Sequence, residues 1–322
     1  MRRDYIILSP NLQNCYDTSR HDDSTERIQA AINEMAKIGG TVFFSMGAYG
    51  LRDTIYVPDG VTLLGEGEGL TNLVWHYYPQ SNVEPPKCLD YLVCGKNVTV
   101  KNLKVSVFAE YDNIITAKEG FTLSGVTVIA TPYMFHRESV VTKIKKSKLV
   151  DTEGSDILVE DVDIFGRGKC ISVRNGKNLT VRNAKIFTSD FGVLAENYEG
   201  IKVDNAFLVG KCDKENIKQE HGLHATADCS LNFMGCKDVA LSNIEVQDLR
   251  AGRYAAIYAN GTDRLSVDTL TTVEVEKSVF CENCRDVSVN DVTVCRGKGV
   301  FADGASISDV KFLGINEKIA MK

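Results

Sequence analysis

Two series of short strand-like segments recur along the chain at an interval near 22 residues, and this repeat constrains the fold more than any other feature. In the first series, apolar and polar residues alternate, as in NLTVRNAKI (178–186) and GIKVDNAFL (200–208). Earlier copies are NVTVKNLKV (97–105) and FTLSGVTVI (121–129), centred on Val100 and Leu123. The later central residues are Val159, Val181, Val203, Leu241, Val267 and Val289, at steps of 22, 22, 38, 26 and 22 residues.

A second series interleaves with the first, in segments such as CISV (170–173), AIYA (256–259) and GVFA (299–302). Its first inward residues are predicted to be Ile171, Val193, Leu223, Ile257, Val279 and Val300, at steps of 22, 30, 34, 22 and 21 residues. A repeat of this length buries its apolar edge only by stacking on its neighbours. We therefore predict an all-β chain that forms a single-stranded right-handed parallel β-helix of about 9–10 coils.

The start of the chain has a different pattern. In DDSTERIQAAINEMAKIGG, apolar residues recur at helical spacing, Ser24 is a candidate N-cap, and Gly39 and Gly40 are a stop signal. We predict a helix over about 22–40 that covers the open end of the solenoid, because an uncovered edge would pair with other chains. Residues 1–322 are predicted to be one β-helix domain, with coils over 41–322 and loop insertions at about 75–90, 130–151, 209–222 and 228–237.

Composition excludes several classes of function. The net charge of -6 and the pI near 5.5 argue against nucleic acid as a partner. No apolar run approaches the roughly 18 residues that a membrane helix needs. The opening MRRDYIILSPN matches a secretion signal poorly, and the cellular location stays open. Of the ten cysteines, Cys281 and Cys284 form a CxxC, but no histidine follows to complete a zinc site, so we expect mostly reduced, buried thiols and no metal centre.

Residues 22–67 contain the segments DDSTERIQAAI, GGTVFFSMGAYGL and IYVPDGVTLLGEG. This stretch resembles the opening of the pectate-lyase-like superfamily of right-handed parallel β-helix proteins, with Ser45 and Met46 at a place where proline is common. Members of that superfamily include polysaccharide lyases, glycoside hydrolases, epimerases and phage tailspikes. The resemblance implies an oligosaccharide or polysaccharide ligand, whereas the fold alone does not name the reaction.

Candidate site residues follow from the coil register. Asp190 and Glu220 take equivalent positions one coil apart in this register, which separates their backbones by about 5 Å. Two carboxyl groups suit glycoside hydrolysis, and flat tyrosine rings suit sugar faces. The predicted catalytic residues are Asp190, Glu220, His221 and His224, and the predicted substrate-binding residues are Arg253, Tyr254, Tyr258, Glu276 and Lys277. In the polygalacturonase branch of the superfamily, NTD and GHG motifs lie on successive coils, and only Asp190 and His221 match them here.

Three functions stay open at this point. A glycoside hydrolase is favoured over a polysaccharide lyase, because carboxylates outnumber convincing calcium motifs. A lyase needs a base such as Arg253, His221, Tyr254 or Lys277, with or without calcium, and no other cofactor is expected. The alternative is a non-catalytic glycan-binding or tailspike-like module. We expect either a monomer or a homotrimer.

Overall fold

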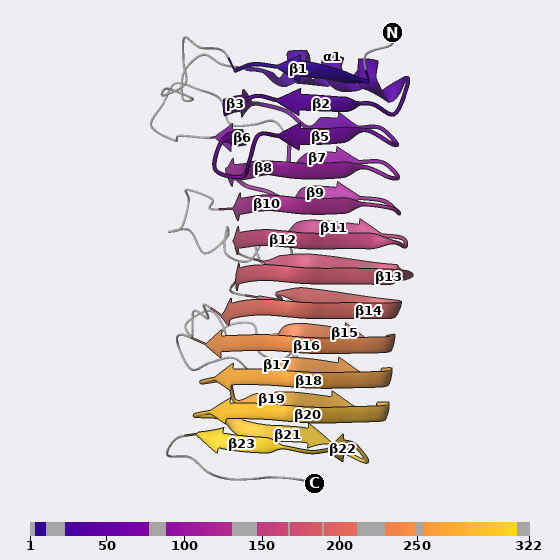
Figure 1. Cartoon of the computed structure of the whole chain (residues 1–322), viewed down its shortest axis with the longest axis vertical. Helices are drawn as coiled ribbons and strands as arrows, with labels where there is room; N and C mark the ends of the chain where they lie inside the picture. The colour runs from indigo at the N-terminus through magenta and orange to yellow at the C-terminus, as the bar shows by residue number, and fades with distance from the viewer. Residues whose placement is uncertain are drawn as a thin grey trace. The chain divides into compact units, whose positions relative to one another are not determined.

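The computed structural model of the chain describes residues 4–10, 23–76, 88–130, 147–166, 168–188, 190–210, 229–248 and 254–313. The chain divides into two compact units, Met1–Arg167 and Gly168–Lys322. In each unit, parallel strands of successive coils lie side by side, as Figure 1 shows. The predicted all-β parallel β-helix is therefore confirmed within each unit.

Unit 1 contains helix α1 and the strands of the first coils. The described strands are β1 (Tyr5–Leu8), β2 (Thr41–Phe44), β3 (Gly47–Leu51), β4 (Ile55–Val57), β5 (Thr62–Gly65), β6 (Thr71–His76), β7 (Asp90–Cys94), β8 (Thr99–Phe108), β9 (Asn113–Ala117), β10 (Thr122–Ala130), β11 (Lys148–Glu153) and β12 (Ile157–Gly166). Strand β10 pairs with β8 and β12, so Val100, Leu123 and Val159 form one column. All three side chains are buried, as the alternating pattern predicts.

Helix α1 (Thr25–Ala36) is shorter than the predicted span of 22–40. It begins where the Thr25 amide donates to the Asp23 carboxylate (3.0 Å), while Ser24 holds the N-cap position without a side-chain cap bond. It ends before a turn in which Gly39 has a φ of 65°, a value that glycine adopts without strain. Its buried residues are Thr25, Ile28, Ala31, Ile32 and Met35, and it packs against β1, β2 and β4. Protection of the open edge by this helix stays a prediction.

Unit 2 continues the same two strand series. Its described strands are β13 (Lys169–Thr188), β14 (Val193–Gly210), β15 (Cys229–Met234), β16 (Lys237–Asp248), β17 (Ala255–Asn260), β18 (Asp263–Val273), β19 (Lys277–Glu282), β20 (Arg285–Cys295), β21 (Lys298–Ala302), β22 (Ser306–Ile307) and β23 (Val310–Leu313). The first series is in the predicted register, because Val181, Val203, Leu241, Val267 and Val289 are successive Cα partners. These side chains form an apolar column in the core of the unit.

The second series departs from the prediction at one coil. Leu231 of β15, and not Leu223, pairs with Val193 on one side and Ile257 on the other. Residues 229–234 are therefore a strand and not part of the insertion predicted at 228–237. The observed steps from Val193 to Leu231 to Ile257 are 38 and 26 residues, the same as those from Val203 to Leu241 to Val267. Both strands of a coil must shift together when a loop is inserted before them, and the predicted steps of 30 and 34 violate this condition.

Left-handed backbone positions recur at the turns between strands. Asn175, Asn197 and Asn283 share one turn position, as predicted, with φ of 53°, 51° and 53°. Asparagine tolerates this conformation because its short polar side chain bonds locally. A second column has the same conformation two residues after the central apolar residue, at Asn183, Asn205, Asn243, Thr269, Asp291 and Asp309. Thr269, with a φ of 59°, is the β-branched member of this column.

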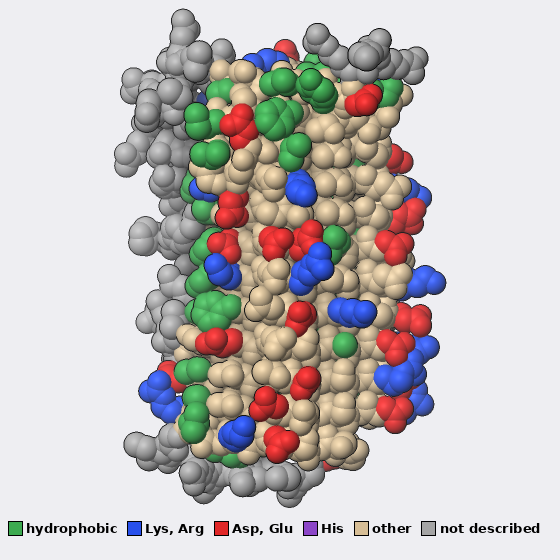
Figure 2. Space-filling view, viewed as in Figure 1, with side chains coloured by type: hydrophobic (Ala, Val, Ile, Leu, Met, Phe, Trp, Pro, Cys, Tyr) green, Lys and Arg blue, Asp and Glu red, His purple; other side chains and the backbone are tan. Residues whose placement is uncertain are grey.

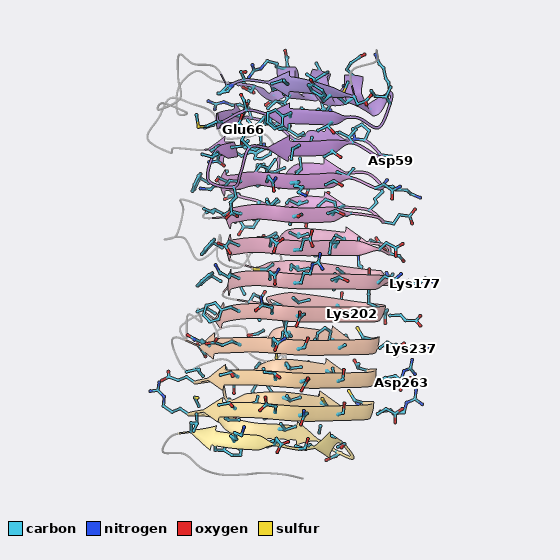
Figure 3. All side chains as sticks on the ribbon, viewed as in Figure 1. Asp59, Glu66, Lys177, Lys202, Lys237 and Asp263 are labelled. Atoms are coloured by element: carbon cyan, nitrogen blue, oxygen red, sulfur yellow. The ribbon has the colours of Figure 1, made fainter. Side chains whose placement is uncertain are left out.

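Charges alternate along one margin of unit 2. Lys177, Glu199, Lys237, Asp263 and Arg285 are Cα partners in successive coils. Figure 2 shows basic and acidic side chains interleaved along this margin, where Figure 3 labels Lys177, Lys237 and Asp263. Lys237 pairs with Glu199 at 3.5 Å, and Arg285 pairs with Asp263 at 3.4 Å. Exposed pairs of this kind stabilise little, but a slip of one coil would place like charges together and is therefore disfavoured.

Candidate functional site

An outward column of side chains crosses the second strand series of unit 2. Asn232, Tyr258, Phe280 and Phe301 are Cα partners in β15, β17, β19 and β21. Each lies between two inward apolar residues, so the alternation of the strand directs it away from the core. The strand pattern thus places three aromatic residues in line on successive coils.

The aromatic rings contact one another and hold a lysine. The Phe280 ring centroid lies 5.7 Å from that of Tyr254 and 5.6 Å from that of Tyr258. Lys277 Nζ lies 4.1 Å from the Tyr254 centroid and 3.7 Å from the Phe280 centroid, and it donates a hydrogen bond to the Tyr254 hydroxyl. It also lies 5.3 Å from the Phe301 centroid. These distances are those of cation–π contacts, so a positive charge is fixed over an apolar surface.

A hollow of about 640 Å³ opens beside these rings. Glu282 and Asp303 each lie three residues after an inward valine, Val279 and Val300, on adjacent coils. Both carboxylate side chains are exposed. The lining consists of Phe280, Cys281, Glu282, Asn283, Cys284, Phe301 and Asp303. The hollow therefore combines aromatic faces, one amide and two carboxylates.

Tyr258 positions one of these carboxylates. Its hydroxyl donates to Glu282 Oε2 at 2.6 Å and accepts from Asn260 Nδ2 at 3.2 Å. Burial raises the pKa of Tyr258 to about 12, and the hydrogen bond to Glu282 adds to the rise. The phenol therefore stays neutral at physiological pH and acts as a fixed donor to the carboxylate.

The structure brings together some of the predicted site residues. Tyr254, Tyr258 and Lys277 surround Phe280, as described above. Glu276 forms an ion pair with Lys298 at 3.1 Å and does not line the hollow. Asp190 follows β13, and its amide nitrogen donates to Thr188 Oγ1 at 3.1 Å. The coil that contains β15 separates Asp190 from Tyr254, so their backbones are about 10 Å apart.

Four predicted residues, Glu220, His221, His224 and Arg253, lie outside the described residues. The register that grouped the first three with Asp190 is wrong, because it depended on Leu223 as the inward residue. In the observed register, Asn232 occupies the position predicted for His224, and Cys229 occupies that predicted for His221.

The analysis of the sequence missed Glu282 and Asp303. It compared the positions before and between the inward residues of each strand, and these two residues come after them. Both acidic residues stand at the same interval from Val279 and Val300, and that shared interval was the available signal. It is modest, because acidic residues are common where strands end in turns.

Within the described ranges, no cluster of three or more histidine, cysteine, aspartate or glutamate side chains is arranged to hold a metal ion. The possible use of calcium thus stays a prediction. None of the described helices is both long and apolar enough to cross a bilayer.

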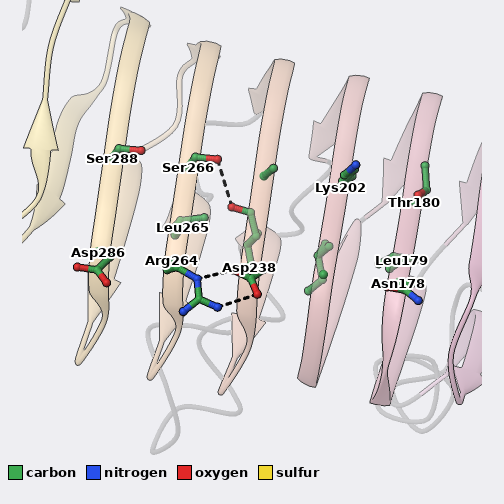
Figure 4. A pocket seen from close by; sticks show the side chains of 14 residues that line it. Asn178, Leu179, Thr180, Lys202, Asp238, Arg264, Leu265, Ser266, Asp286 and Ser288 are labelled. Atoms are coloured by element: carbon green, nitrogen blue, oxygen red, sulfur yellow. Dashed lines mark hydrogen bonds and ion pairs between the residues drawn. The ribbon is translucent and has the colours of Figure 1, made fainter.

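A second hollow, of about 520 Å³, lies over β13, β14, β16, β18 and β20 (Figure 4). Arg264 binds Asp238 through two hydrogen bonds, one of them 2.7 Å from Nη2 to Oδ2, and Ser266 donates to the Val239 carbonyl oxygen at 3.4 Å. Among the described residues that line it, none is aromatic. Since one acidic side chain is already neutralised by an arginine, this surface is less suited to a sugar than the hollow beside Phe280 and Phe301.

Comparison with known proteins agrees with this architecture. No protein-family model matches the sequence, and no curated protein matches it. Among solved structures, a polygalacturonase from Erwinia carotovora ssp. carotovora is similar over 98% of this chain and 96% of its own, with a TM-score of 0.58 and 14% identity. PfbA, a surface adhesin of Streptococcus pneumoniae, is similar over 95% of this chain and 90% of its own, with a TM-score of 0.53 and 10% identity. At this level of identity the likeness concerns the fold, and the chain has the right-handed parallel β-helix fold of the pectate-lyase-like proteins.

Proposed function

We propose that the chain binds a saccharide in the hollow beside β19 and β21 and hydrolyses a glycosidic bond there. The observation that carries this proposal is the placement of two carboxylates, Glu282 and Asp303, on adjacent coils next to the rings of Phe280 and Phe301. The shared fold with a polygalacturonase supports a carbohydrate ligand. The fold similarity does not identify the reaction, so the carboxylates carry that part of the argument.

The hollow suits a sugar in size and composition. Its volume of about 640 Å³ is within the range of ordinary small-molecule sites. Phe280 and Phe301 offer apolar faces for the C–H side of a sugar ring, and Asn283 offers an amide for hydroxyl groups. Lys277 adds a positive charge over the same rings, which favours a sugar that carries a carboxylate or sulfate.

The two carboxylates have different surroundings. Glu282 accepts a hydrogen bond from neutral Tyr258, which stabilises its charged form and suits a nucleophile or general base. Asp303 is then the general acid that protonates the leaving oxygen. Strands of adjacent coils lie about 4.8 Å apart, and side-chain direction decides whether the carboxyl groups are about 5 Å apart, for retention, or about 6.5–9.5 Å apart, for inversion. Asp190 stays a proposed third acidic residue of the site.

A lyase reaction would use the same surface differently. In that case, Lys277 or Tyr254 would take the proton next to a uronate carboxylate, and calcium would assist in neutralising that carboxylate. The lysine ammonium held against Phe280 and Tyr254 is available for either role.

The second candidate function is glycan binding without cleavage. PfbA, which has a similar fold over most of its length, is a surface adhesin. The aromatic and basic surface around Phe280 is sufficient for binding, whereas cleavage needs Glu282 and Asp303 as well. The two functions therefore differ in what the carboxylate variants do.

The experiment measures cleavage and binding of neutral and acidic oligosaccharides by the wild type and by Glu282→Gln and Asp303→Asn. We expect a loss in kcat of about 10²–10⁴-fold for each variant with binding retained. The matched control is Glu276→Gln, an exposed carboxylate outside the hollow, which keeps its activity. Absorbance from an unsaturated product would indicate the lyase.

Full turnover by both carboxylate variants would refute the proposed hydrolase site. Binding without any product from the wild type, weakened by Phe301→Ala, would support the adhesin-like function instead.

A further inference from the structure

The CxxC sequence has a structural setting that distinguishes it from the other cysteines. Of the described cysteines, all of which are free thiols, Cys88, Cys94, Cys170, Cys229 and Cys236 are buried, as expected from the sequence. Cys281 and Cys284 are only half-buried. They lie at the end of β19, and both line the hollow beside Phe280 and Phe301.

The turn after β19 brings the two sulfur atoms together. Asn283, between them, has a φ of 53°, which reverses the direction of the chain directly after the strand. The Cys281 and Cys284 side chains are hydrogen-bonded to each other. Cys281 stands in the inward column between Ala259 and Ala302, so small neighbours surround it.

The two thiols differ in reactivity. A hydrogen bond from Cys281 lowers the pKa of Cys284 from its ordinary value of 9.0 to about 7. The same bond, together with burial, raises the pKa of Cys281. Cys284 also lines a neighbouring hollow of about 420 Å³ with Asp263 and Arg285, so a water-soluble molecule reaches it from two directions.

We propose that Cys281 and Cys284 form a reversible disulfide by exchange with a low-molecular-weight disulfide that enters this hollow. The Cys284 thiolate attacks one sulfur of the small disulfide, which forms a mixed disulfide and releases one small thiol. Cys281 then loses its proton, and its sulfur attacks Cys284, which closes the Cys281–Cys284 bond and releases the second small thiol. Two protein thiols are oxidised by two electrons, and the small disulfide is reduced to two thiols. This modification site is independent of whether the hollow binds a saccharide.

The size of the effect follows from the two thiols. At pH 7 a thiol of pKa 7 is half ionised, which is about 50-fold more thiolate than at a pKa of 9.0. Intrinsic nucleophilicity falls as the pKa falls, so the net gain in exchange rate is about six-fold over an ordinary accessible thiol. Cys281 in the absence of Cys284 should react more slowly still, because its sulfur is more buried.

The experiment exposes the reduced full chain to oxidised glutathione at pH 7, quenches with acid, and maps the cysteine peptides by mass spectrometry. We expect a Cys281–Cys284 disulfide that dithiothreitol reverses. Cys281→Ser should leave Cys284 as a stable glutathione adduct. Cys284→Ser should leave Cys281 at least six-fold less reactive than Cys284 is in the first variant. Cys295→Ser, which removes another half-buried thiol, is the matched control and should behave as the wild type.

Two results would overturn the proposal. One is the absence of a Cys281–Cys284 peptide pair after oxidation of the folded chain. The other is an equal rate of glutathione addition to the two single variants, which would mean that neither thiol activates the other.

Discussion

Replacement of Thr269 by asparagine should stabilise unit 2. Thr269 is an exposed residue of β18 with a φ of 59°, a left-handed conformation that is rare for a β-branched side chain. The equivalent residues in the neighbouring coils are Asn243 and Asp291, which have the same backbone conformation. Because Thr269 is exposed, its replacement opens no cavity, and the backbone strain is the main quantity that changes.

The expected gain follows from the cost of this conformation. A left-handed backbone costs an ordinary L-residue about 1–2 kcal/mol, and asparagine avoids much of this cost. We therefore expect Thr269→Asn to raise the free energy of unfolding by about 1 kcal/mol. At about 2.1 cal/mol/K per residue, this raises Tm by about 1.5 °C if all 322 residues unfold together, and by about 3 °C if unit 2 unfolds by itself.

Urea unfolding followed by circular dichroism measures the difference. The matched control is Thr271→Asn, two residues further along the same strand, where the φ is not positive. This control introduces the same side chain without relief of strain, and it should be neutral or slightly destabilising. If both variants change the urea midpoint equally, the argument from backbone strain is wrong.

Two further predictions test the core and the tyrosine. Leu231→Ala should lower the free energy of unfolding by about 2–5 kcal/mol, because Leu231 is buried between Val193 and Ile257; Leu313→Ala, at a residue that is 58% exposed, should cost less than about 0.5 kcal/mol in the same urea titration. The raised pKa of Tyr258 means that the folded form keeps its proton while the unfolded form loses it, so this contribution to stability is present below pH 10.0 and is lost as the pH rises toward about 12. Tyr258→Phe should therefore lose less stability than the wild type between these values, and equal pH slopes would contradict the assigned pKa.

Most of the coil register could be predicted from the sequence. The alternation around Val181, Val203 and Leu241 places one side of each strand in the core, and a slip of one residue would expose that whole side. The equal interval between copies then places these residues in one column. Asn175, Asn197 and Asn283 could be assigned to one turn for the same reason, since few residue types tolerate a left-handed backbone.

The misplaced coil has a physical cause. Between β14 and β16, two segments of the sequence have a suitable apolar pair, around Leu223 and around Leu231, and local alternation does not distinguish them. The choice depends on pairing with strands on both sides, to Val193 and to Ile257. The acids predicted near the site were counted from the wrong residue, and the error carried over to Glu220, His221 and His224.

The sequence by itself determined that this chain winds into stacked coils, because its period and its alternation are local properties that every repeat states again. Only the tertiary structure decided that Glu282 and Asp303 share a hollow with Phe280 and Phe301, and that Tyr258 holds Glu282. These side chains come from strand ends on different coils. Their proximity depends on the direction in which each turn leaves its strand, and that direction is set by contacts between coils.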